Sequence, residues 1–310
     1  MASLKEIKSR INSINGTLKI TSAMKMVASA KLHKVQNAIT NMLPYERQLH
    51  EILSRLLSDS RETESATGCE EFIIQRPVQK VAIIAVSSNS SLCGAFNANA
   101  IRHFRETAAK YAENGLSKED ILVFPVGRKM AEAVIKDGFM PQGDYNSLAE
   151  KHIYKDVSGF ADNLIKRYLD GEIDKIELVY NHYKSSASQV PVNETYLPFD
   201  INPDTGENKN GSAVLGDRNA ADSYLKNYIV EPDPQSVLRL LLPKVLILKI
   251  YTMLLDANAA EHAARTIAMQ EATDNAQQLL QELKLQYNKQ RQQAITDELL
   301  DIVSGTMVNN

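Results

Sequence analysis

The chain has 310 residues and a formal net charge of −3, which allows one or two domains and gives no global attraction to nucleic acid. Its two cysteines, Cys69 and Cys93, exclude a disulfide framework and favour a reducing compartment. The most apolar run, 237–255, contains Arg239, Lys244 and Lys249. Charges at the centre of a membrane helix cost about 2.5–3.5 kcal/mol each, so no membrane span is expected.

Residues 1–58 are expected to form one long helix. Apolar side chains at Leu4, Ile7, Ile11, Ile14 and Leu18 are spaced by three and four residues, which is the repeat of a coiled coil. The pattern then shifts phase and continues through Met24, Val27, Ala28, Leu32, Val35, Ile39 and Met42. Residues 1–40 carry seven Lys or Arg and one acid, so this helix has a cationic surplus.

An α/β domain is expected over 77–200. Buried strands are predicted at 81–86 and 121–126, because both are short, continuous apolar runs bounded by polar residues. A third strand is predicted at 176–183 and a fourth at 190–199, pairing antiparallel with it. Helices are predicted at 95–112, 129–136 and 157–169. This alternation favours a small, mostly parallel sheet, resembling a Rossmann layer.

A loop and linker are expected over 201–234, and a second long helix over 235–305. No proline or glycine occurs between Lys244 and Ser304. Its narrow apolar stripe is typical of a coiled-coil contact line and comprises Met269, Ala272, Ala276, Leu280, Leu283, Tyr287, Ile295, Leu299 and Ile302. The fold class predicted is α/β, with an antiparallel two-helix coiled coil of the N- and C-terminal helices and the α/β domain inserted between them.

No catalytic motif is found. Gly211 and Gly216 have P-loop spacing, but Asp217 and Arg218 follow where Lys and Ser or Thr are needed. The six histidines lack metal-ligand spacing and are expected on surfaces or helix faces. The turn Ser90–Asn97 follows the first strand, where α/β sheets bind ligands. It is either such a site or a tight turn with Ser91 or Asn97 capping the next helix.

A set of short segments spans nearly the whole chain. They are 5–11 (KEIKSRI), 19–28 (KITSAMKMVA), 92–97 (LCGAFN), 231–234 (EPDP), 261–265 (EHAAR), 272–276 (ATDNA), 287–289 (YNK) and, within 291–305, Arg291-Gln292, 294–296 (AIT), Glu298-Leu299 and 302–305 (IVSG). In content and order they resemble the gamma subunit family of F-type ATP synthases, with a departure at Ser88–Ser91.

The resemblance implies a rotor subunit and not an enzyme. It implies one copy per complex, inside an alpha–beta hexamer, with the epsilon subunit and the membrane c-ring at the α/β domain. It further implies a peripheral position on the cytoplasmic face of a bacterial plasma membrane. Nucleotide and Mg²⁺ would bind to the partners, and no cofactor is expected here. No redox switch is expected from Cys69 and Cys93.

The same resemblance assigns contact residues. Those expected to face the alpha–beta head and couple it to the shaft are Arg10, Met24, Lys25, Arg265, Arg291, Gln292, Thr296 and Glu298. Contacts of the α/β end are expected at Tyr228, Glu231 and Asp233. Two alternatives remain: a coiled-coil adaptor whose basic first helix binds nucleic acid or membrane, and an α/β enzyme with coiled-coil arms.

Overall fold

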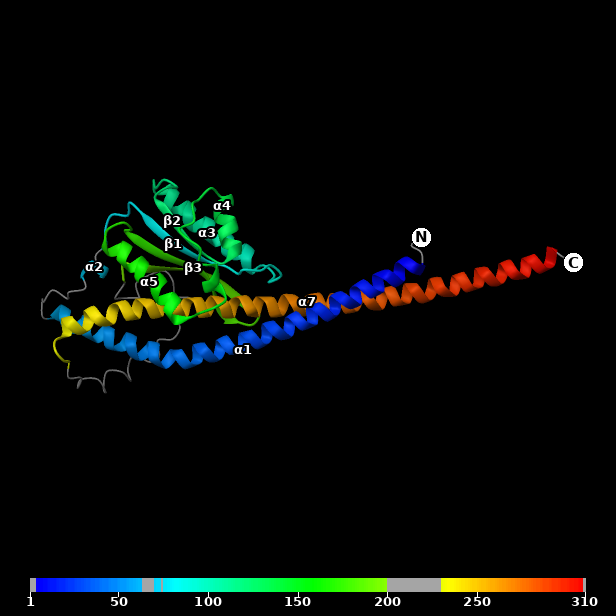
Figure 1. The fold of residues 1–310 in the computed structure, drawn as a ribbon, viewed down its shortest axis with the longest axis horizontal. Coiled ribbons are helices and arrows are strands. Elements are labelled where there is room, and N and C mark those ends of the chain that lie inside the picture. Colours follow the sequence, from blue (N-terminus) through cyan, green and yellow to red (C-terminus); the bar gives the residue numbers. More distant parts are fainter. Residues whose placement is uncertain (1–3, 63–69, 74, 200–229, 309–310) are drawn as a thin grey trace. The chain divides into compact units, whose positions relative to one another are not determined.

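The computed structural model describes residues 4–62, 70–73, 75–199 and 230–308 and divides into two compact units (Figure 1). Lys31–Ala264 holds an α/β domain with the adjoining parts of two long helices. The second unit, called here the helix pair, combines Met1–Ala30 with Arg265–Asn310. Residues 201–229 of the expected loop, with its P-loop-like glycines and Tyr228, lie outside the described residues.

Two long helices account for much of the chain. Helix α1 spans Leu4–Glu62 and helix α7 spans Pro234–Val308, so both expected helices are present. Pro44 and Pro243 lie inside them without ending them. Within the described residues, neither helix has a stretch both long and apolar enough to cross a bilayer.

Helix α7 begins where Asp233 caps it. The Asp233 Oδ1 atom accepts the Ser236 N–H at 2.8 Å, and Oδ2 accepts the Ser236 hydroxyl at 2.7 Å. These two bonds lower the pKa of Asp233, because both favour the carboxylate. Pro234 follows at the first helical position, where its missing N–H costs nothing. Asp233, expected to contact a partner, therefore has a local structural role.

The sheet has the predicted strands and directions. Its strands are β1 (Val81–Val86), β2 (Ile121–Val126), β3 (Lys175–Ser185) and β4 (Ser188–Leu197), in the order β2-β1-β3-β4. Strand β1 is parallel to both neighbours, and β4 is antiparallel to β3. The strands β2 and β1, which are apolar on both faces, occupy buried positions, as continuous apolar runs require.

Helices cover both faces of the sheet. On one face, Val81, Ile83 and Ala85 pack with α3 (Phe96–Glu113) and α4 (Arg128–Lys136). On the other face, Ala82 and Ile84 pack with α5 (Tyr154–Leu169), α7 and the 49–56 part of α1. Two short elements were not predicted, α2 (Glu70–Ile73) and the 3₁₀ helix η1 (Asn146–Ala149). Burial of each large apolar side chain contributes about 1.5–3 kcal/mol, so this core holds the domain together.

A buried carboxylate fixes the register of β3 and β4 against α3. Glu177 accepts hydrogen bonds from Lys175 Nζ at 2.7 Å, Asn193 Nδ2 at 3.0 Å and the Tyr111 hydroxyl. Burial, then the contact with Glu177, raises the pKa of Tyr111. A buried charge is tolerated only when it is paired and hydrogen-bonded, and Glu177 meets both conditions.

Gly127 joins β2 to α4 in a conformation that other residues rarely adopt. Its φ is +100°, and a Cβ placed there would lie 2.3 Å from the Ser87 carbonyl oxygen. Both the backbone conformation and the close approach to β1 therefore require glycine.

We expect Gly127→Ala to lower the free energy of unfolding by about 1–3 kcal/mol, because the added methyl group meets backbone. Gly159→Ala is the matched control: no atom lies within 4 Å of its Cβ position on α5, so it should gain about 0.5–1 kcal/mol. Urea unfolding of the purified chain measures both. Equal effects of the two substitutions would contradict the tight approach at Gly127.

Candidate functional site

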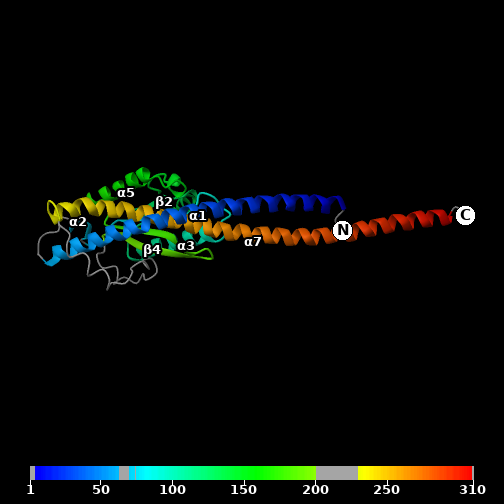
Figure 2. The same ribbon diagram turned by 90° about the horizontal axis from the view of Figure 1, so that it is seen from below.

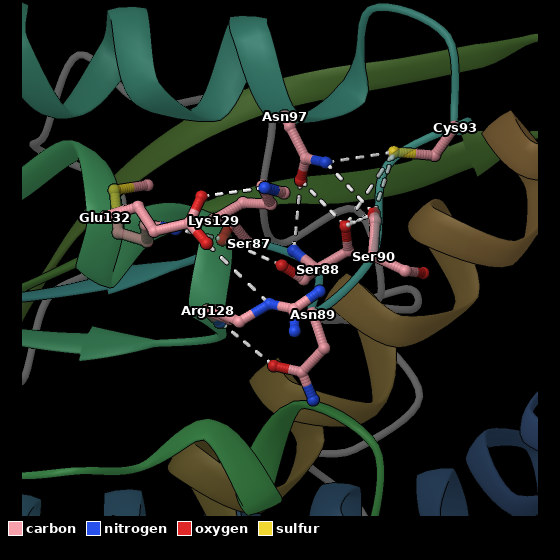
Figure 3. Close-up of polar contacts among 10 residues, drawn as sticks. Ser87, Ser88, Asn89, Ser90, Cys93, Asn97, Arg128, Lys129 and Glu132 are labelled. Carbon is pink, nitrogen blue, oxygen red and sulfur yellow. Dashed lines mark hydrogen bonds and ion pairs between the residues drawn. The ribbon is translucent and has the colours of Figure 1, made fainter.

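The turn after β1 occupies the position where an α/β sheet ordinarily binds a ligand. Strands β2 and β3 flank β1 on opposite sides, so the chain changes direction across the sheet beside β1. The residues that follow, Ser87–Asn97, are mostly small and polar. Figure 3 shows their side chains directed toward one another and toward the first turn of α4.

Asn97 organises this turn. Its Oδ1 atom accepts hydrogen bonds from the Ser88 backbone N–H at 3.1 Å and the Ser88 hydroxyl at 2.9 Å. Its Nδ2 group donates to the Ser90 carbonyl at 3.3 Å and contacts the Cys93 sulfur at 3.2 Å (Figure 3). Neither predicted residue occupies the N-cap position of α3: that residue is Ala95, without a side-chain cap bond. The capping prediction is wrong, because Asn97 lies inside the helix and its side chain reaches back to β1.

The first amides of α4 are also bound by this turn. The Arg128 N–H donates to Asn89 Oδ1 at 2.9 Å, and the Met130 N–H donates to the Ser87 hydroxyl at 2.7 Å. The Lys129 N–H donates to the Ser88 carbonyl at 3.2 Å. Such amides are the groups with which a helix N-terminus binds phosphate. Here the chain's own oxygens accept all three bonds, which favours a tight turn over a phosphate site at this position, although the expected cap is absent.

The charged side chains of this region pair locally. Lys129 Nζ lies 2.7 Å from a Glu132 oxygen, and Arg128 Nε lies 3.7 Å from the other (Figure 3). The Lys129 contact lowers the pKa of Glu132. Within the part of the chain that the structure describes, no three His, Cys, Asp or Glu side chains gather as metal ligands.

The histidines were expected on surfaces or helix faces, and His262 does lie on a helix, although it is only 7% exposed within α7. His152 lies outside the helices and strands and is half-buried, and burial lowers its pKa to about 4. His182, on β3, pairs with an acidic residue of α7, a contact that local sequence could not indicate.

The helix pair forms a second candidate surface. The Thr21 and Thr273 hydroxyl oxygens lie 2.9 Å apart, and Lys25 Nζ donates to Gln270 Oε1. The residue numbers of the contacting pairs rise along α1 while they fall along α7. The two segments are therefore antiparallel, as predicted. Buried residues along the contact are Ile7, Thr21, Ala28, Met269, Ala276, Leu280 and Leu283.

Two parts of the predicted contact line are not buried. Val27 is 58% exposed, because the contact passes through Thr21 and Ala28. Ile295, Leu299 and Ile302 are also exposed, and Figure 2 shows α7 continuing past the N-terminal end of α1. The pattern there correctly identifies an apolar stripe, but no other described part of the helix pair covers it.

The predicted contact residues occupy different environments. Met24 and Lys25 are half-buried, and Arg265 is buried. Gln270, which the sequence analysis missed, binds Lys25 and donates to both Asp274 oxygens at 2.8 Å. Gln270 and Asp274 are four residues apart, which makes them neighbours on one helix face, and this spacing could have indicated their hydrogen bond from the sequence. The exposed predicted residues are Arg10, Arg291, Gln292, Thr296, Glu298 and Glu231.

In the part of the chain that the structure describes, the α/β domain adjoins two long helices, and its own side chains occupy the usual ligand position after β1. A family model described as ATP synthase matches residues 3–307. The ATP synthase gamma chain of Phocaeicola vulgatus is 53% identical over 307 residues, covering 99% of this chain and 100% of that protein. That of Flavobacterium johnsoniae is 42% identical over 310 residues, with 100% of both covered.

Solved structures share the fold. A chain of the Euglena gracilis mitochondrial ATP synthase, in a structure containing OSCP, F1 and c-ring, aligns with a TM-score of 0.60 and 18% identity, covering 98% of this chain and 93% of that one. A chain of the Tetrahymena thermophila mitochondrial ATP synthase, in a structure of the central stalk and c-ring, aligns with a TM-score of 0.52. The alignment covers 82% of this chain and 99% of that one. This chain belongs to the ATP synthase gamma chain family, and it is a non-catalytic subunit of that complex.

The hydroxyl contact at the centre of the helix pair can be tested by a double-mutant cycle. We expect Thr21→Val and Thr273→Val to be coupled by about 1 kcal/mol in the free energy of unfolding, since each single change leaves the other hydroxyl without this partner. Urea unfolding of the four proteins measures the coupling.

Thr17→Val is the control, because the Thr17 hydroxyl donates to Ser13 of its own helix. Its effect should add to that of Thr273→Val within about 0.5 kcal/mol. If the effects of Thr21→Val and Thr273→Val on the free energy of unfolding were simply additive, the predicted coupling between the two hydroxyl groups would be contradicted.

Proposed function

We propose that this chain is the central-stalk rotor that couples proton flow through the membrane sector to ATP synthesis in an alpha–beta catalytic head. Membership of the gamma chain family supports this most strongly. In this proposal it is a peripheral subunit on the cytoplasmic face of a bacterial plasma membrane, in one copy. Its partners are the alpha–beta hexamer, the epsilon subunit and the c-ring, and nucleotide and Mg²⁺ bind to them.

The helix pair is proposed as the shaft, an antiparallel coiled coil turning inside the head. Its exposed apolar side chains support the proposal, because contiguous exposed apolar surface often marks contact with other proteins. On α1 these are Ile20, Met26 and Val27, and on α7 they are Ile267, Leu279, Leu285, Ile295, Leu299, Leu300 and Ile302. A turning shaft needs such contacts to be apolar and undirected, so that each can break at the next step.

In this proposal, Lys25 and Met24 contact the head without forming a strong directed bond to it. The Lys25 ammonium is bound to Gln270, and Gln270 is bound to Asp274, so the charge is held within the pair. Met24 beside it offers a flexible apolar surface. The coupling contacts proposed are Arg10, Met24, Lys25, Arg265, Arg291, Gln292, Thr296 and Glu298, and those of the α/β end are Tyr228, Glu231 and Asp233.

Copurification is the direct test of the assignment. The tagged chain, solubilised with its membranes, should bring down alpha and beta subunits in about threefold excess over itself, together with c-ring and epsilon subunits. Recovery of the chain alone, or with nucleic acid in a strongly salt-dependent complex, would contradict the rotor assignment.

We expect Met24→Lys to leave assembly intact but lower the proton pumping obtained per ATP hydrolysed. The new ammonium could form a charge-assisted bond to an acidic residue of the head, worth roughly 1.5–3 kcal/mol. Breaking it would slow a rotary step about tenfold or more. ATP-driven acidification of membrane vesicles, measured beside the hydrolysis rate, gives the ratio.

Met24→Leu is the control, since it retains an apolar side chain of similar volume and should keep the ratio of the unmodified enzyme. Position 24 would be a packing position without a coupling role if Met24→Lys kept that ratio as well.

A further inference from the structure

One carboxylate of α7 holds the β3–β4 hairpin at two atoms, within the unit Lys31–Ala264. Asp256 Oδ2 lies 2.6 Å from His182 Nδ1, and Asp256 Oδ1 accepts the Tyr183 backbone N–H at 3.1 Å. Both side chains are mostly buried, at 29% exposed for His182 and 19% for Asp256. The bonds therefore form in a partly desolvated place, where charge strengthens them.

The hairpin needs this contact because its own ladder is irregular there. Tyr183 lies opposite Gln189, and the register shifts between Tyr183 and Ser185. The Tyr183 N–H is directed to Asp256, and the Tyr183 hydroxyl accepts a hydrogen bond from Gln36 of α1 at 2.9 Å. Strand β3 is thus attached to both long helices at neighbouring residues.

Charged groups from every adjoining element face this contact. Lys249 of α7 lies 3.7 Å from Glu194 of β4. Burial raises the pKa of Glu46 on α1 and also that of Tyr180 on β3. The Asp256 and Glu194 carboxylates act on the His182 imidazole and favour its protonated form, whereas Glu46 interacts with Lys249 and Glu194.

We propose that the His182–Asp256 pair is a pH-dependent latch that holds the β3–β4 hairpin on α7 while His182 is charged and loosens when it is neutral. A protonated imidazole gives Asp256 a charge-assisted hydrogen bond, about twice as strong as a neutral one. Loss of the proton removes the charge, and the partly buried carboxylate then holds β3 through the Tyr183 N–H and a weaker imidazole contact.

The direction of the pH effect follows from the same contacts. The hydrogen bond to Asp256 raises the pKa of His182, against the opposing effect of burial, and the charges of Asp256 and Glu194 add to the increase. A raised pKa gives stabilisation that is complete below the ordinary value of about 6.5 and is lost as pH rises through the folded-state pKa. The latch is therefore closed at pH 6 and opens as pH rises through the folded-state pKa of His182.

Hydrogen exchange on the full-length chain tests the latch and does not depend on the rotor assignment. Protection of residues 181–186, corrected for intrinsic exchange and compared with β1, should fall about fivefold between pH 6 and pH 9. This measurement needs no variant, so misfolding cannot hide its result. An unchanged ratio of protection between the hairpin and β1 across that range would overturn the proposal.

Three variants assign the effect to His182. His182→Lys keeps a positive charge to pH 9 and should remove the pH dependence, whereas His182→Gln should show the low protection at both pH values. Glu46→Gln is the control for the neighbouring acid of α1 and should keep the unmodified profile. The proposal is also overturned if His182→Lys shows the same loss of protection as the unmodified chain.

Discussion

The structure depends on the need to cover apolar side chains along two very long helices. Helices of 59 and 75 residues cannot bury their own apolar stripes, so each must pack against something else along its length. Inside the unit Lys31–Ala264, the α/β domain meets this need, and its core includes Leu53 of α1 and Leu246 of α7. In the helix pair the segments cover each other from Ile7 to Ala28. The remaining apolar surface is available to other proteins.

The α/β domain has an architecture that often binds ligands, but in its described residues the usual position after β1 is occupied by its own side chains. Its strand order creates the usual crevice beside β1, but Ser87, Ser88 and Asn89 direct their oxygens to the amides of α4. Bonds that would hold a phosphate instead hold β1, β2 and α4 together. These bonds tie the end of β1 to the start of α4.

The sequence predicts the repeating elements because their causes are local. Runs such as 81–86 and 121–126 are apolar and short, and both became buried strands at the expected residues. Contacts between distant residues carry no such signal: Glu177 with Tyr111, and His182 with Asp256, depend on the fold already being formed. Ile295 shows the limit of periodicity, which identifies an apolar stripe but not what covers it. The roles assigned to Arg10, Arg291 and Glu298 stay predictions.

Rotation of the α/β domain against a fixed catalytic head tests the central claim most directly. A probe can be attached at exposed Glu113 of α3 as Glu113→Cys, after Cys69 and Cys93 have been replaced by alanine, in complexes immobilised through their beta subunits. The account predicts stepwise rotation of the probe in one direction while ATP is hydrolysed. Sustained hydrolysis with a stationary probe, in complexes that pump protons normally, would contradict it.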